Sequence, residues 1–115
     1  MSKIRLVINN ESKKNEREKF FIKKELQSIL NLYAKMVSNG TWKDYSFTSG
    51  IKEVSFNVYQ RASEKPVLRI LKNLKPKYFN EKYLIKDKNG SIVKKSENLN
   101  QLISKTSWNK LKLIK

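Results

Sequence analysis

Apolar side chains between residues 20 and 38 recur at the spacing of one face of an α-helix, with polar side chains on the other face. Asn39-Gly40 follows this segment, and glycine tolerates the left-handed conformation in which many helices end. The pattern predicts an amphipathic helix from about Glu18 to Ser38. Its apolar stripe is expected to consist of Ile22, Leu26, Ile29, Leu30, Tyr33, Met36 and Val37.

After Gly40 the apolar period changes to two, which is typical of half-buried β-strands. The clearest example is residues 54–59, where Val54, Phe56 and Val58 alternate with polar neighbours. Asn89-Gly90 predicts a tight hairpin turn, because this dipeptide accepts positive φ angles. The remaining strands are predicted over residues 44–48, 67–72, 83–86 and 91–95, and a short closing helix around Leu99, Leu102 and Ile103.

These elements predict an α+β fold, in which the N-terminal amphipathic helix packs on an antiparallel meander of four or five strands and a short C-terminal helix follows. The helix is expected to cover one face of the sheet, so that the other face meets water or a partner. The chain divides into a polar N-terminal arm (1–19), a single α+β domain (20–105) and a basic C-terminal tail (106–115).

Composition removes several classes of chemistry. The chain has no cysteine and no histidine, which excludes disulfide scaffolds, thiolate zinc sites and the commonest general base. Its 3 glycines cannot build a glycine-rich phosphate cradle. We therefore expect no enzyme activity, no catalytic residue, no metal and no cofactor. No apolar run is long enough for a membrane span or a signal peptide, so a cytoplasmic location without integral membrane attachment is predicted.

The net charge of +16 on 115 residues is the strongest indication of a partner. Residues 1–64 hold 12 cations and 7 acids, whereas residues 65–115 hold 14 cations and 3 acids. The excess therefore lies mostly in the C-terminal half. It favours a polyanionic partner, most plausibly RNA or DNA, although a solvated basic surface would have the same composition.

The alternation of the strands indicates which residues would meet such a partner. If Val54, Phe56 and Val58 point into the core, their neighbours point outward, and Arg69 does so on the next strand. Aromatic rings can stack on bases while cations contact phosphates. The candidate nucleic-acid-binding residues are Tyr59, Arg61, Arg69, Lys82, Lys86, Lys94 and Lys95. Trp42 is expected to anchor the edge of the core, whereas Trp108 could belong to the core or to a binding surface.

Three segments carry a family resemblance: Glu25 to Tyr33, Gly40-Thr41-Trp42-Lys43-Asp44-Tyr45, and Tyr59 to Pro66 with its Arg-Ala-Ser-Glu step. Together with the late hairpin they resemble an alphaproteobacterial family of small proteins, domain of unknown function 2794, over roughly residues 24–104. The resemblance implies an alphaproteobacterial, cytoplasmic origin and no known activity. It marks as candidates Trp42, Asp44, Tyr45, Arg61, Ser63 and Glu64.

Three functions follow as hypotheses. The first is a small non-catalytic binding module for RNA or DNA that acts through phosphate contacts. The second is a protein-protein interaction module that uses the Trp42/Arg61–Glu64 surface, with the charge serving solubility or steering. The third is attachment to anionic lipid at a membrane surface. Dimerisation through an apolar edge strand is also compatible with the sequence, which leaves the oligomeric state open.

Overall fold

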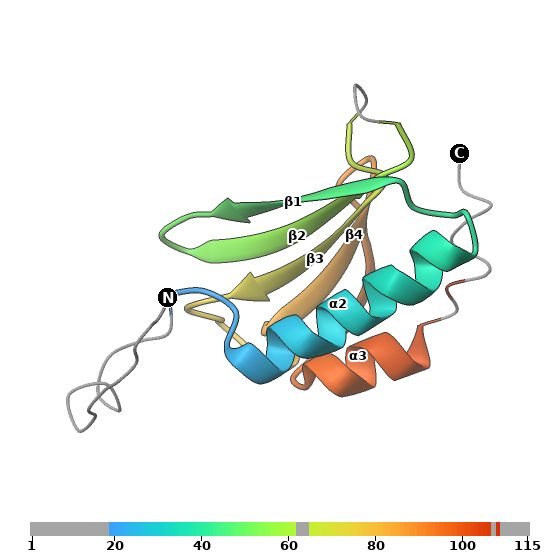
Figure 1. The fold of residues 1–115 in the computed structure, drawn as a ribbon. Coiled ribbons are helices and arrows are strands. Elements are labelled where there is room, and N and C mark those ends of the chain that lie inside the picture. Colours follow the sequence, from blue (N-terminus) through green and yellow to red (C-terminus); the bar gives the residue numbers. More distant parts are fainter. Residues whose placement is uncertain (1–18, 62–64, 107, 109–115) are drawn as a thin grey trace.

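The computed structural model describes residues 19–61, 65–106 and 108, and these residues form the predicted α+β fold (Figure 1). The predicted arm and tail lie almost entirely outside the described residues. Five strands follow one helix, and a second, shorter helix closes the domain. In chain order the elements are α2 (Lys23–Ser38), β1 (Asp44–Ser49), β2 (Glu53–Tyr59), β3 (Leu68–Asn73), the 3-10 helix η1 (Phe79–Glu81), β4 (Tyr83–Asp87), β5 (Ile92–Ser96) and α3 (Leu99–Lys105).

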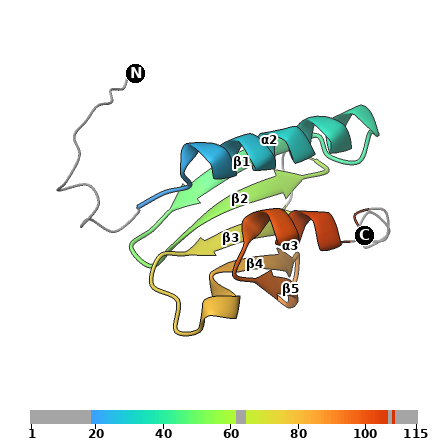
Figure 2. The ribbon, with the colours of Figure 1, turned by 90° about the horizontal axis from the view of Figure 1, so that it is seen from below.

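The strands form one antiparallel sheet in the order β1-β2-β3-β4-β5, so each strand pairs with its neighbour in sequence. Both helices lie on the same side of this sheet, with α3 beside α2 (Figure 2). One face of the sheet is therefore covered by helices, as the sequence predicts. The strand bounds agree with the predicted ranges to within one or two residues at each end.

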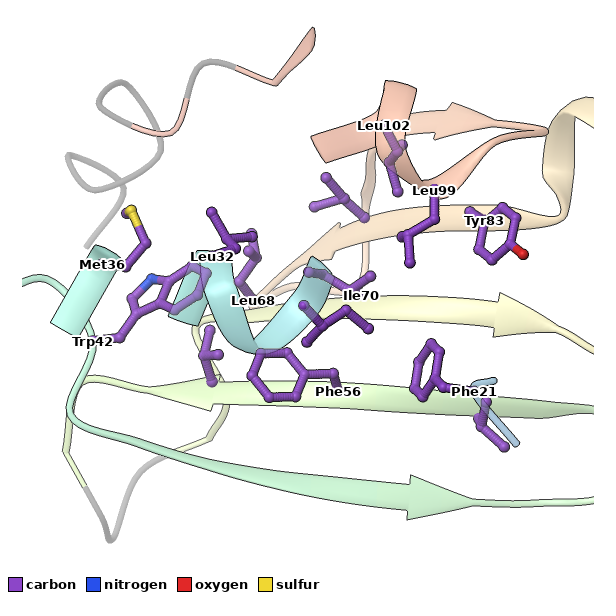
Figure 3. Close-up of a cluster of buried hydrophobic side chains, with 14 residues drawn as sticks. Phe21, Leu32, Met36, Trp42, Phe56, Leu68, Ile70, Tyr83, Leu99 and Leu102 are labelled. Atoms are coloured by element: carbon purple, nitrogen blue, oxygen red, sulfur yellow. The ribbon is translucent and has the colours of Figure 1, made fainter. Parts of the chain in front are cut away.

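The hydrophobic core fills the space between the helices and the sheet (Figure 3). Val54, Phe56 and Val58 of β2 are buried, and they belong to one cluster with residues of both helices. An aromatic row continues the core toward β1, where the rings of Phe47 and Phe56 lie 5.3 Å apart. The inward side of the strands is thus the one predicted from their alternation. The other core residues include Phe21, Ile29, Leu32, Met36, Leu68, Ile70, Tyr83, Ile85, Leu99 and Leu102.

The first helix differs from its prediction in its start and in its buried face. It begins at Lys23 rather than near Glu18, and the Ile22 backbone N–H donates to Glu25 Oε1 at 2.8 Å. This bond satisfies a donor that the first helical turn leaves without a partner. The predicted stripe was wrong at Leu30 and Val37, which are each 40% exposed, and at Ile22, which precedes the helix and is 42% exposed. The buried positions of α2 are instead Glu25, Ile29, Leu32 and Met36, spaced at i, i+4, i+7 and i+11.

The two predicted glycine turns are confirmed. Gly40 has φ +76° directly after α2, and Gly90 has φ +85° in the β4–β5 hairpin. Trp42, next to the first turn, is buried as expected and packs edge-on against Trp108, with the ring centroids 5.8 Å apart. The Trp108 indole N–H donates to the Ile103 carbonyl at 2.9 Å, so the packed part of the chain continues past α3 to this residue.

Candidate functional site on the open face of the sheet

The face of the sheet that points away from both helices is the surface with the candidate binding residues. Successive residues of a strand point to opposite faces, so the neighbours of Val54, Phe56 and Val58 lie on this side. The register continues the surface across the sheet, because Asn57 pairs with Arg69. We call this surface the open face. Its members are Asp44, Ser46, Thr48, Glu53, Ser55, Asn57, Tyr59, Arg69, Leu71, Asn73, Leu84, Lys86, Ile92 and Lys95. Four of them, Ser55, Asn57, Leu71 and Leu84, are buried.

The β1–β2 half of the open face is a chain of hydrogen-bonded polar side chains. The Asn57 amide N–H groups donate to Ser46 Oγ at 3.1 Å and to Thr48 Oγ1 at 2.9 Å. Ser55 Oγ donates to Asn57 Oδ1 at 2.8 Å, and the Tyr59 hydroxyl lies 3.0 Å from Ser46 Oγ. These bonds fix the orientation of the side chains, so this half of the face is polar and ordered.

The β3–β5 half of the open face is cationic. Arg69 and Lys86 are directly opposite each other in the β3–β4 register, and Arg69 is exposed while Lys86 is half-buried. Side chains in that position have Cβ atoms about 4.5–5.5 Å apart. Among the residues that the structure describes, neither cation forms an ion pair. Lys95, on the neighbouring strand, lies 3.7 Å from a Glu81 carboxylate oxygen and is 46% exposed at its side chain.

The structure separates two lysines that the sequence interpretation placed on one surface. Lys95 faces the open side opposite Leu84, but Lys94 pairs with Ile85 and faces the helices. Lys94 Nζ donates to the Lys105 carbonyl at 3.2 Å, at the C-terminal end of α3, where a cation is favoured. The placement of Lys94 on the binding surface was therefore wrong, because consecutive strand residues cannot share a face.

The other candidates are spread around the sheet. Lys82 precedes β4, and its Nζ lies 5.5 Å from the centroid of the Tyr83 ring, at the end of the sheet. Arg61 is exposed and lies two residues past Tyr59, the last residue of β2. The open face thus brings together Tyr59, Arg69, Lys86 and Lys95, with Arg61 near one end. Ser63 and Glu64 lie outside the described residues.

The candidates of the Trp-Lys-Asp-Tyr segment contribute mainly to the core. Trp42 is 4% exposed, and the Tyr45 ring lies 4.8 Å from that of Tyr33. Burial, together with the nearby Asp44 and Tyr45, raises the pKa of the Tyr33 phenol above its ordinary value. Asp44 is exposed, and its carboxylate accepts the Tyr45 backbone N–H at 2.8 Å. Lys43, Asp44 and Tyr45 are exposed, Tyr45 to 41%, so only Trp42 of this segment is removed from solvent.

A buried polar cluster was missed by the sequence interpretation. Lys72 of β3 is fully buried and its Nζ lies 2.8 Å from Glu25 Oε1, while the Tyr83 hydroxyl donates to Glu25 Oε2. The signal was present, because the alternation that points Leu68 and Ile70 inward also points Lys72 inward. The cluster joins α2 to the sheet.

The described residues offer little for a small ligand or a metal. A groove of about 860 Å³ runs between α2 and α3 and is lined mainly by serine, asparagine and lysine with a few apolar side chains. No three His, Cys, Asp or Glu side chains of the described part approach one another closely enough to hold a metal ion. In the same part of the chain, every helix is too short or too polar to cross a membrane.

Comparison with known proteins assigns the chain to a family. Residues 19–103 match the family described as "Protein of unknown function (DUF2794)". No curated protein and no solved structure matches the chain. The matched range includes every described strand and most of both helices, and so includes the whole open face.

Proposed function

The chain belongs to the DUF2794 family, and from that premise we propose that it is a small non-catalytic module that binds RNA or DNA through the open face of its sheet. Arg69, Lys86 and Lys95 contact phosphate groups in this proposal. Tyr59 lies at the edge of the contact, and Arg61 extends it past the end of β2. The family has no assigned function, so the proposal depends on the geometry of this face.

The observation that carries the proposal is the cross-strand pair of Arg69 and Lys86. Like charges directly opposite each other destabilise a sheet, and opposite charges stabilise it. A phosphate placed between the two cations would convert this repulsion into two attractive contacts. A surface that is merely solvated has no need to place two cations at the same cross-strand position.

The polar half of the face complements the cationic half. Asn57 is fixed by three hydrogen bonds beside Arg69, and the Tyr59 hydroxyl is held by Ser46. Pre-ordered side chains lose little conformational entropy when a ligand binds. Ser55 and Asn57 are themselves buried, so in this proposal the more exposed Ser46, Thr48 and Tyr59 meet sugar or base edges while the cations contact phosphates.

Fluorescence anisotropy of the purified full chain tests the proposal. Labelled single-stranded RNA, single-stranded DNA and duplex DNA are titrated over a salt series, because each neutralised phosphate releases counterions and steepens the salt dependence. We expect binding that persists near physiological salt. We also expect the variant Arg69→Gln/Lys86→Gln to bind more weakly and with a shallower salt slope.

The matched control is Lys94→Gln, which removes one cation from the helix side of the same sheet. Equal losses per charge removed, in the control and in the open-face variant, would mean that net charge alone drives binding, and the proposal would fail. If only protein partners are captured from lysate after nuclease treatment, the protein-interaction hypothesis gains instead. With Trp42 buried, such a partner would use Asp44, Tyr45 and Arg61.

The proposal also includes the place of action. We infer a cytoplasmic location in an alphaproteobacterium, which the resemblance of the Trp-Lys-Asp-Tyr and Arg-Ala-Ser-Glu segments implies. Fractionation of source cells with an antibody against the chain checks the location. Recovery in the periplasm would contradict it.

A further inference from the structure

One end of the sheet carries two neighbouring turns with exposed apolar side chains. The β1–β2 turn and the β3–β4 connection lie side by side, because the Leu74 backbone N–H donates to the Lys52 carbonyl at 2.8 Å. Both views show the two turns at the same end of the sheet, opposite the β4–β5 hairpin (Figures 1 and 2). We call this end the tip and define it as residues 51–52 and 74–82.

The tip exposes three large apolar side chains to solvent. Ile51 is 85% exposed, Phe79 is 81% exposed and Tyr78 is 58% exposed. Within the described part of the chain, no other large hydrophobic side chain is more than 52% exposed. Exposed apolar side chains at one end of a small domain favour an interaction site there, because their burial is favourable and their exposure is not.

Lysines surround these apolar side chains. Lys52 is adjacent to Ile51, while Lys75, Lys77 and Lys82 belong to the β3–β4 connection. Lys77 Nζ lies 5.7 Å from the centroid of the Tyr78 ring, so this cation lies beside one of the exposed apolar side chains. The acid of the tip, Glu81, is directed to Lys95 of β5. The tip is therefore apolar at its end and positive around it.

We propose that the tip is a second binding site, which inserts shallowly into the surface of a membrane that contains anionic lipid. Phe79, Tyr78 and Ile51 would enter the boundary between headgroups and acyl chains, and the lysines would contact lipid phosphates. Anionic lipid is a better fit than nucleic acid because the aliphatic side chain of Ile51, the most exposed of the three, gains nothing from base stacking. The site is distinct from the open face.

Vesicle co-sedimentation of the full chain tests this proposal. We expect binding to vesicles of phosphatidylcholine with added phosphatidylglycerol and little binding to phosphatidylcholine alone. The variant Ile51→Ser/Phe79→Ser should lower the association constant for the anionic vesicles by at least ~10-fold, since it removes two apolar side chains that enter the membrane in this proposal. The variant Phe79→Trp should keep or strengthen binding, because tryptophan favours the membrane interface.

The matched control is Val37→Ser/Ile92→Ser, which removes two other exposed aliphatic side chains, 40% and 52% exposed, outside the tip. This control should bind the anionic vesicles as the unchanged protein does. The proposal is overturned if Ile51→Ser/Phe79→Ser binds them equally well, or if the control loses as much. It is also overturned if the tip variant loses affinity for labelled nucleic acid instead of lipid. Unchanged nucleic-acid binding keeps this test separate from that of the open face.

Discussion

Lys72 Nζ lies 2.8 Å from Glu25 Oε1, in an ion pair whose side chains are 1% and 9% exposed. It joins the first turn of α2 to strand β3. The same Lys72 ammonium donates to the Phe20 carbonyl at 3.0 Å, and Glu25 also accepts from Tyr83 and from the Ile22 backbone. Desolvation of two charges is costly unless their hydrogen bonds are satisfied, as they are in this cluster.

Replacement of one partner of this pair should destabilise the fold strongly. We expect Lys72→Met to lower the free energy of unfolding by about 3–5 kcal/mol, because it leaves the Glu25 carboxylate buried without its cation. Urea denaturation followed by circular dichroism measures the loss. The double variant Glu25→Leu/Lys72→Met should recover much of it, since no isolated charge then remains in the core.

The exposed pair of Lys95 and Glu81 provides the comparison, with an N–O distance of 3.7 Å. Lys95→Met should change the free energy of unfolding by no more than about 1 kcal/mol, because solvent screens an exposed pair. If both lysine variants were equally stable, the buried pair would have no special part in holding α2 on the sheet.

High pH should weaken the fold through Tyr33. Its pKa is raised in the folded protein by burial and by the nearby Asp44 and Tyr45, so the folded state holds the phenolic proton more tightly than the unfolded state. The corresponding stability is fully present below the unfolded pKa of about 10 and is lost as pH rises through the higher folded pKa. Thermal unfolding between neutral and alkaline pH should show a steeper decline for the unchanged protein than for Tyr33→Phe. Parallel curves would contradict this expectation.

The hairpin glycine has a required conformation. Gly90 has φ +85°, where a Cβ atom is strained although no neighbouring atom lies within 4 Å of its position. Gly90→Ala should therefore cost about 1 kcal/mol of stability, a backbone effect and not a packing effect. Gly90→Asn should cost less, since asparagine tolerates the left-handed region. Equal losses in the two variants, measured by urea denaturation, would contradict the backbone explanation.

Local patterns predicted most of the fold, because the sheet is a meander whose strands pair with their sequence neighbours. The alternation around Phe56 fixed the inward face, and Asn89-Gly90 fixed the last hairpin. Features that depend on the meeting of distant segments were harder to predict. The helical period alone left the phase of α2 uncertain, and the burial of Leu32 instead of Leu30 depends on how the helix rests on the sheet.

The same distinction applies to the candidate site. Alternation correctly placed Arg69 on the face opposite the core, but the pairing of Arg69 with Lys86 depends on a register that composition does not reveal. A count of lysines along β5 could not separate Lys94 from Lys95, whereas the alternation of the strand could have done so. The apolar tip was not predicted, because the exposure of Phe79 depends on two turns meeting at one end of the sheet.

The charge at position 86 should have opposite effects on folding and on binding. Lys86→Glu replaces a like-charge pair with an opposite-charge pair across β3 and β4, so we expect the free energy of unfolding to rise by about 0.2–1 kcal/mol. The same change should weaken nucleic-acid binding. It should also make the plot of log association constant against log salt concentration less steep by about 1, as expected for the loss of one phosphate contact. Urea denaturation and anisotropy on the same preparation measure the two effects.

A second variant separates this prediction from a general effect of charge. Lys88→Glu makes the same change of charge in the exposed β4–β5 turn, away from Arg69. It should leave stability nearly unchanged and reduce binding less than Lys86→Glu does. If Lys86→Glu gains stability and loses affinity while Lys88→Glu does neither to the same extent, Lys86 costs the fold stability and contributes to the binding of a polyanion. If Lys86→Glu instead lost stability, the two cations would not repel each other in the folded protein and the main support for the nucleic-acid proposal would be removed.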